Sequence, residues 1–232
     1  MGFVTSLQKE HLTKYVVNQM RIFFPDELYQ DAESALNSVM DETLDRLYVC
    51  LDSICVRGFH DENNNAFFNH LHADHYATFL YFLSNTLWDR KQEKMLCDKL
   101  MYLNRALHQV FISYKCRLPE HFHLAHPIGT VLGNADYNDF LVIAQGVTVN
   151  TGLNGGSSPK LGKGLFLSAG SSIIGNGELS IGDYVSIGVN CLIYKQSVPD
   201  NMVVKFKKDN PCSIEPRKNA VCRAQRDFNI AF

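Results

Sequence analysis

Residues 161–198 read LGKGLFLSAGSSIIGNGELSIGDYVSIGVNCLIYKQSV. An aliphatic residue returns every six positions, with two extra residues in the middle of the run: Leu161, Leu167, Ile173, Ile181, Ile187 and Ile193. A period of six fits neither a helical turn of about 3.6 residues nor the simple alternation of a strand. Each unit is therefore expected to be a short strand and a tight turn, and such units stack into a solenoid with the aliphatic residue inside. A β-sandwich, the alternative, predicts irregular strand spacing.

The region before this repeat predicts helices from residue 7 to about 110. Apolar residues recur there at spacings of three and four, the period of one helix face: Leu36, Val39, Met40, Leu44, Leu47, Leu51 and Ile54. Pro25–Glu27 is a plausible start for that helix, and 76–88 is apolar nearly all round, as in a buried helix. The predicted class is α+β, with a helical N-terminal domain (1–117), a parallel solenoid (118–204) and a C-terminal tail (205–232).

Composition excludes several kinds of partner. The chain has 232 residues, of which 46% are hydrophobic, and a net charge of -2. It therefore has a core of useful size and no electrostatic attraction to nucleic acid or an anionic membrane. No stretch has the length of a signal peptide core or a membrane span, so we expect a cytoplasmic protein. Seven cysteines without a CxxC pair predict reduced thiols.

Four short motifs carry a family resemblance. In chain order they are LAHPIG (124–129), QGVT (145–148), PKLG (159–162) and IIGN (173–176). Together with the six-residue repeat of aliphatic residues, these motifs resemble the hexapeptide-repeat acyltransferases, whose repeat forms a left-handed parallel β-helix. Within that superfamily the chain resembles serine acetyltransferase, which also has a helical N-terminal domain, and the serine-acetyltransferase-like proteins of surface-polysaccharide synthesis.

The resemblance implies an O-acetyltransferase that uses acetyl-CoA and works by direct transfer. His126 matches the family's general base, and a neutral imidazole near pH 7 suits both proton transfers; a histidine that is merely packed at the first coil is the alternative. Glu120, Asp136 and Asp139 are the nearby carboxylates that are candidates for orienting its ring. No metal is expected, since a polar helix start explains His70, His72 and His75. The family also implies a homotrimer, or a multiple of it, with shared active sites.

Small residues match the positions where the family places the pantetheine arm of the cofactor. The expected cofactor-binding residues are Ser168, Ala169, Gly170, Ser186, Gly188 and Val189. Small side chains let a ligand approach the backbone and bond to its amides. The cations after the last coil, among them Lys205 and Arg217, are either solvated surface charges or contacts to the cofactor phosphates.

Two departures from the family concern the acceptor. Serine acetyltransferases carry Asp before the catalytic His and an Arg-His pair before the Pro-Lys motif, whereas this chain has Ala125 and Ser157-Ser158. We therefore expect a sugar or polysaccharide hydroxyl as acceptor, with serine as the alternative and a non-enzymatic scaffold as a third hypothesis. The turn-rich stretch 150–158 predicts a loop for substrate, with Asn150, Ser157 and Ser158 as binding residues.

Overall fold

The computed structural model describes residues 2–26, 31–150, 158–219 and 221–228. The chain divides into two compact units. One comprises Met1–Asp52 and Arg57–Lys115, and the other Ser53–Val56 and Cys116–Phe232. The three-part division at residues 117/118 and 204/205 stays a prediction.

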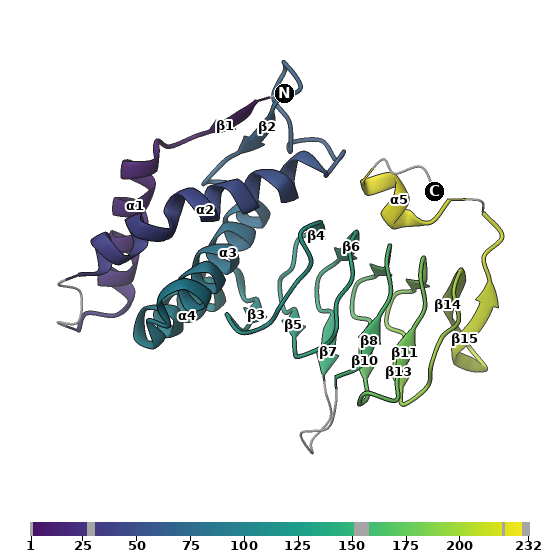
Figure 1. Ribbon diagram of the computed structural model, residues 1–232. Coiled ribbons are helices and arrows are strands. Elements are labelled where there is room, and N and C mark those ends of the chain that lie inside the picture. The colour runs from purple at the N-terminus through teal and green to yellow at the C-terminus, as the bar shows by residue number, and fades with distance from the viewer. Residues whose placement is uncertain (1, 27–30, 151–157, 220, 229–232) are drawn as a thin grey trace. The chain divides into compact units, whose positions relative to one another are not determined.

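In its described residues, the first unit has four helices and three short strands. Figure 1 shows them in purple to teal. The helices are α1 (Lys9–Phe23), α2 (Ala32–Asp52), α3 (Ala73–Lys91) and α4 (Lys94–His108), and the strands are β1 (Phe3–Thr5), β2 (Ala66–Phe68) and β3 (Phe111–Ile112). Strand β1 pairs with β2 in parallel. As its sequence predicts, α3 is buried on nearly every side, and α2 packs one apolar face that includes Leu36, Met40 and Leu47.

Helix α2 begins later than expected. Pro25 and Asp26 lie outside any helix, and α2 starts at Ala32. Instead of facing a first turn of backbone amides, Asp26 accepts a hydrogen bond from the buried Lys99. Burying an unpaired ammonium costs more free energy than an acidic residue contributes at a helix end. This difference accounts for the wrong prediction that Asp26 lies in the first turn of α2.

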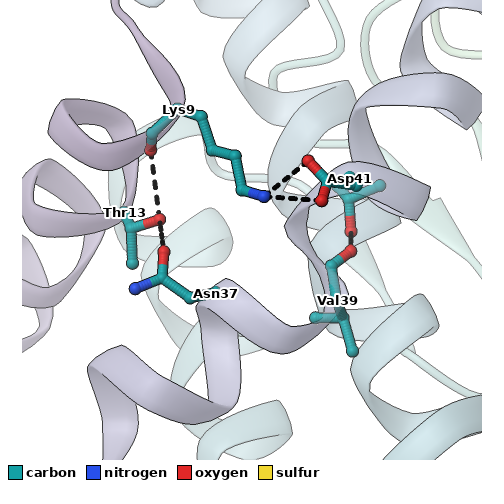
Figure 2. Close-up of polar contacts among 6 residues, drawn as sticks. Lys9, Thr13, Asn37, Val39 and Asp41 are labelled. Carbon is teal, nitrogen blue, oxygen red and sulfur yellow. Dashed lines mark hydrogen bonds and ion pairs between the residues drawn. The ribbon is translucent and has the colours of Figure 1, made fainter.

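Polar contacts join α1 to α2 (Figure 2). Lys9 Nζ lies 2.6 Å from both carboxylate oxygens of Asp41. One turn further along α1, the Thr13 hydroxyl lies 2.7 Å from Asn37 Oδ1 and 3.1 Å from the Lys9 carbonyl. Thr13 is fully buried, and its hydroxyl has acceptors on both helices, so burial does not leave it without a hydrogen-bond partner.

The second unit is a parallel β-helix of three faces, whose coils Figure 1 shows stacked from teal to yellow. The first face holds β4 (Phe122–Leu124), β6 (Leu141–Ile143), β9 (Phe166–Leu167), β12 (Ser186–Ile187) and β14 (Met202–Lys207). The second holds β5 (Val131–Leu132), β7 (Thr148–Asn150), β10 (Ser172–Ile174) and β13 (Leu192–Tyr194). The third holds β8 (Lys160–Leu161) and β11 (Ser180–Ile181), extended by bridges at Asp136 and Val198.

The hexad residues form the core of this β-helix. Their exposed fraction is at most 2% at all six positions: Leu161, Leu167, Ile173, Ile181, Ile187 and Ile193. The predicted inward register is therefore confirmed. Parallel pairing such as Ile173 with Ile193 places them in columns, so each aliphatic side chain packs on those of the neighbouring coils.

The last residues extend the β-helix and then return along it. After β14, β15 (Asn210–Pro216) pairs antiparallel with that strand, and the chain ends in a short helix, α5 (Arg223–Asp227), beside β6. Among the helices of the described residues, none combines the length and apolar character that crossing a bilayer requires.

Candidate active site

His126 lies where the chain passes from the first face to the second. In the later coils the chain segment that forms this corner is short: it runs from Ala144 to Gly146, from Ser168 to Gly170 and from Gly188 to Asn190. In the first coil it runs from Ala125 to Gly129, two residues longer. The strands on either side stay in register, since Leu124 pairs with Ile143 and Val131 with Thr148. His126 and Pro127 are thus an insertion into an otherwise regular corner.

The insertion gives His126 an unusual backbone and an open side chain. Its φ is 52°, in the left-handed region, which His tolerates better than most residues that have a Cβ. A hydrogen bond of 2.7 Å from the Ile128 N–H to the His126 carbonyl fixes the turn. The residue is exposed, so its imidazole is accessible to a substrate.

Hydrogen bonds tie this corner to the corners of the coils below it. The Gly146 N–H donates to Ile128 O at 2.9 Å, and the Asn190 N–H donates to Ala169 O at 3.0 Å. We call residues 125–130, 144–147, 168–171 and 188–191 the His126 corner. It contains five of the six predicted cofactor-binding residues: Ser168, Ala169, Gly170, Gly188 and Val189.

The sixth, Ser186, lies on the adjoining first face, and it lines one cavity of about 410 Å³ together with Ser168 and Gly188. The cavity is also lined by Lys205 and Arg217. Arg217 Nη2 donates to Ser186 Oγ at 3.3 Å and to the Tyr184 carbonyl. The sequence therefore predicts a set of residues that the fold gathers on one face and its adjoining corner.

Two of the carboxylates proposed to orient His126 lie on other parts of the β-helix. Glu120 is exposed and precedes His121, whose ring nitrogen is 3.1 Å from Asp139 Oδ1 where the third face meets the first. Asp136 pairs with Lys160 on the third face. The structure does not bring either carboxylate to the His126 corner, and their role in orienting the ring stays a prediction.

The predicted substrate residues lie between the second and third faces. Asn150 ends β7 and is exposed, and its carbonyl accepts the Gly175 N–H at 3.2 Å. Ser158 Oγ accepts a hydrogen bond of 2.8 Å from Asn134 Nδ2. Ser157 lies outside the described residues, as does most of the predicted loop.

Sequence reasoning missed the part played by the C-terminal segment. Lys218, Arg223 and Arg226 also line the 410 Å³ cavity, and Asp227 reaches His123 on β4. The spacing of Arg223 and Asp227, four residues apart, was the available signal, because such pairs stabilise a helical turn. Among the described residues, no group of three or more His, Cys, Asp or Glu side chains is arranged to hold a metal ion.

Sequence and structure comparisons point to one family name. No family model matches the chain. A serine acetyltransferase of Synechococcus elongatus is 33% identical over 121 residues, which are 50% of this chain and 49% of that protein. The chain thus spans about half the length of the curated relative that it matches.

Solved structures agree with this over a longer part of the chain. Serine acetyltransferase of Neisseria gonorrhoeae has a TM-score of 0.68 at 22% identity and covers 97% of this chain and 86% of its own. A serine acetyltransferase in complex with CoA has a TM-score of 0.63 at 22% identity, over 83% of this chain and 80% of its own.

At this identity the solved structures establish the fold, and they confirm the predicted class, a helical N-terminal region followed by a left-handed parallel β-helix. The motifs read from the sequence predicted the same family. The chain therefore resembles serine acetyltransferase, in sequence over half of its residues and in fold over nearly all of them.

Proposed function

We propose that this protein is an acetyl-CoA-dependent O-acetyltransferase of the serine acetyltransferase type, with His126 as its general base. The observation that carries the proposal is the insertion of His126 into the corner. It displays an exposed imidazole at the end of a column of small residues, while the strands beside it keep their register. A histidine in the left-handed region at that single position is the kind of local strain that functional sites retain.

The chemistry follows from the imidazole. Neutral His126 accepts the proton of the acceptor hydroxyl as its oxygen attacks the thioester carbonyl. The C–S bond then breaks, and the imidazolium returns the proton to the departing thiolate. Both transfers use one group because the pKa of histidine lies near neutral pH. Neither step requires a metal or an acyl-enzyme.

Acetyl-CoA as the acetyl donor is supported by two observations. A serine acetyltransferase of the same fold has been solved in complex with CoA. In this chain the small residues Ser168 and Gly188 lie in the His126 corner, in the coils that follow His126 itself, and they leave room for an extended arm beside the backbone.

The comparisons favour L-serine as the acceptor, because the relatives carry the name serine acetyltransferase. A sugar or polysaccharide hydroxyl is the second candidate. It is favoured by Ser158, which stands where the family has an Arg-His pair and whose hydrogen-bond partner, Asn134, is also neutral. Neutral donors suit a hydroxyl-rich ligand, whereas a serine carboxylate benefits from a cation.

A homotrimer, or a multiple of it, is part of the proposal. Apolar side chains are exposed on the outer side of the second face, with Val131 38%, Leu192 48% and Tyr194 58% accessible. Association of copies through this face would remove them from water. Light scattering should give three or six times the mass of the 26.3 kDa chain, and an active monomer would contradict the shared site.

A thiol-release assay with a panel of acceptors tests the reaction. Acetyl-CoA is supplied with L-serine, with monosaccharides or with oligosaccharides, and kcat/KM is compared across the panel. Efficient turnover of serine with inert sugars supports the first candidate, and the reverse supports the second. If no acceptor causes thiol release, the hypothesis of a non-enzymatic scaffold remains.

A further inference from the structure

Thr130 ends the turn that carries His126, and its side chain is fully buried. Its N–H donates a hydrogen bond of 3.0 Å to the Pro127 carbonyl, which closes the turn. Its hydroxyl donates a hydrogen bond of 3.1 Å to the Ala144 carbonyl in the next coil. One residue therefore closes the turn and also ties it to the neighbouring coil.

Thr130 belongs to a column of buried residues, one in each coil. The parallel pairing of the second face places Val147, Ser171 and Cys191 at the equivalent positions, and each is about as buried as Thr130. The next coil thus has valine where the first has threonine, and the two side chains have the same shape. Because the fold accepts valine at this level of the corner, filling the space does not explain the Thr130 hydroxyl.

The hydroxyl acts at the corner that contains the insertion. In this corner, as in the one that follows, a backbone bond runs to the next coil: the Gly146 N–H donates to the Ile128 carbonyl, and the Gly170 N–H donates to the Gln145 carbonyl, both at 2.9 Å. The bond from Thr130 adds a second tie beside the first. A corner with two extra residues has more conformational freedom to lose, so an additional restraint matters most there.

The backbone of this turn decides where the imidazole of His126 lies. A general base must stand within hydrogen-bond reach of the proton that it removes, and a displacement of about 1 Å can lower a rate by up to about 100-fold. Movement of the turn would therefore affect proton transfer far more than the binding of an acetyl donor along the later coils.

We propose that the Thr130 hydroxyl positions His126, through its hydrogen bond to the Ala144 carbonyl, and that turnover depends on this bond. The inference rests on the proposed function, because it requires His126 to be the general base. Thr130 is a positioning residue, since its buried side chain acts on the reaction only through the turn.

Steady-state kinetics of the full chain test the proposal, using acetyl-CoA and the best acceptor of the thiol-release panel. Thr130→Val keeps the shape of the side chain and removes the hydroxyl. It should lower kcat by about 10-fold, because the base is less well placed. The KM for acetyl-CoA should change by less than about twofold, because binding is not the step affected.

Thr130→Ser and Thr130→Ala provide a second comparison that does not depend on how well valine is accommodated. Both variants lack the methyl group, and only the serine variant keeps the hydroxyl. The kcat of Thr130→Ser should stay near that of the wild type, whereas Thr130→Ala should lose about as much as Thr130→Val. Circular dichroism checks that each variant is folded.

A double-mutant cycle with His126→Asn separates positioning from a general effect on the fold. If Thr130 acts through the imidazole, Thr130→Val should cause no further loss of kcat once His126 has been replaced. A hydroxyl that only stabilised the fold would lower kcat by the same factor in both backgrounds.

Thr43→Val is the matched control. Thr43 is a fully buried threonine of α2, and its hydroxyl donates to the Val39 carbonyl at 2.9 Å. This substitution removes a buried hydroxyl of the same kind from a helix, and it should leave kcat unchanged.

The outcomes distinguish this inference from the proposed function. Wild-type kcat in Thr130→Val, equal kcat in Thr130→Ser and Thr130→Ala, or an equal loss in the His126→Asn background would overturn the role of Thr130 and leave acetyl transfer intact. A similar loss in Thr43→Val would overturn it as well. A wild type that releases no thiol with any acceptor would overturn both proposals.

Discussion

His123 and Asp227 are 104 residues apart in sequence, yet His123 Nδ1 lies 3.3 Å from Asp227 Oδ2. Each side chain is only 6% exposed. Burial alone would raise the pKa of Asp227, but the hydrogen bonds from His123 and Arg223 outweigh it and lower the pKa below its usual value. The pair joins the last helix to the first strand of the β-helix.

Asp227→Asn should destabilise the β-helix unit by about 1.5–3 kcal/mol, the usual contribution of hydrogen bonds to a charged group. Thermal unfolding followed by circular dichroism at neutral pH measures the loss. Asp209→Asn, at an exposed turn, is the control and should unfold like the wild type. Equal stability of the two variants would show that the buried pair of His123 and Asp227 does not stabilise the β-helix unit.

His126→Asn should lower turnover by on the order of a hundredfold, the usual contribution of a positioned general base. Asn is chosen over Ala because it also tolerates the left-handed backbone, with φ of 52°, and so removes the base without straining the corner. His121→Asn, between the third face and the first, serves as the control. Near-normal activity of His126→Asn would show that another residue acts as the general base.

Ile193 and Leu192 test the register of the β-helix, because these neighbours are 1% and 48% exposed. Ile193→Ala should cost about 2–5 kcal/mol of unfolding free energy, as for other large-to-small core changes. Leu192→Ala should cost within about 0.5 kcal/mol in dilute solution. Chemical denaturation gives both values, and a reversed order would place the wrong side chain inside.

His108 should make the helical unit less stable in mild acid. Burial lowers its pKa to about 4, so between there and the ordinary value of 6.5 the unfolded chain binds a proton that the folded chain does not. Stability therefore rises with pH across this window and falls on acidification, by at most about 3 kcal/mol. His108→Asn should flatten the dependence of the unfolding midpoint on pH, whereas His11→Asn, at an exposed position, should not.

The parts of the fold that repeat locally could be predicted from the sequence. The fixed six-residue period predicts that Ile173 and Ile187 point inward. A nearly unbroken run of apolar residues predicts the buried helix that contains Tyr76. The position of Asp26 outside α2 could not be predicted, since Asp26 accepts a hydrogen bond from Lys99, which is 73 residues away in sequence. Contacts between distant segments leave no period in a sequence.

The candidate site shows the same division. His126 and Ser168 were found because they occupy a motif and a small-residue position in the repeat. The cavity wall at Lys218 and Arg226 follows from the return of the chain across the first face, which no local pattern encodes. Glu120 and Asp136 lie within ten residues of His126 in sequence, but the coil places Glu120 before the first face and Asp136 on the third face, so their role in orienting the ring stays a prediction.

The two inserted residues at the His126 corner also bear on how such a chain can change over evolutionary time. Since the strands on both sides keep their register, deletion of His126 and Pro127 would leave a corner of the same length as the equivalent corners of the other coils. A solenoid can therefore gain or lose a reactive group by a short insertion, without a compensating change in its interior. In this architecture, the β-helix and the reactive residue that it carries need not have the same evolutionary origin.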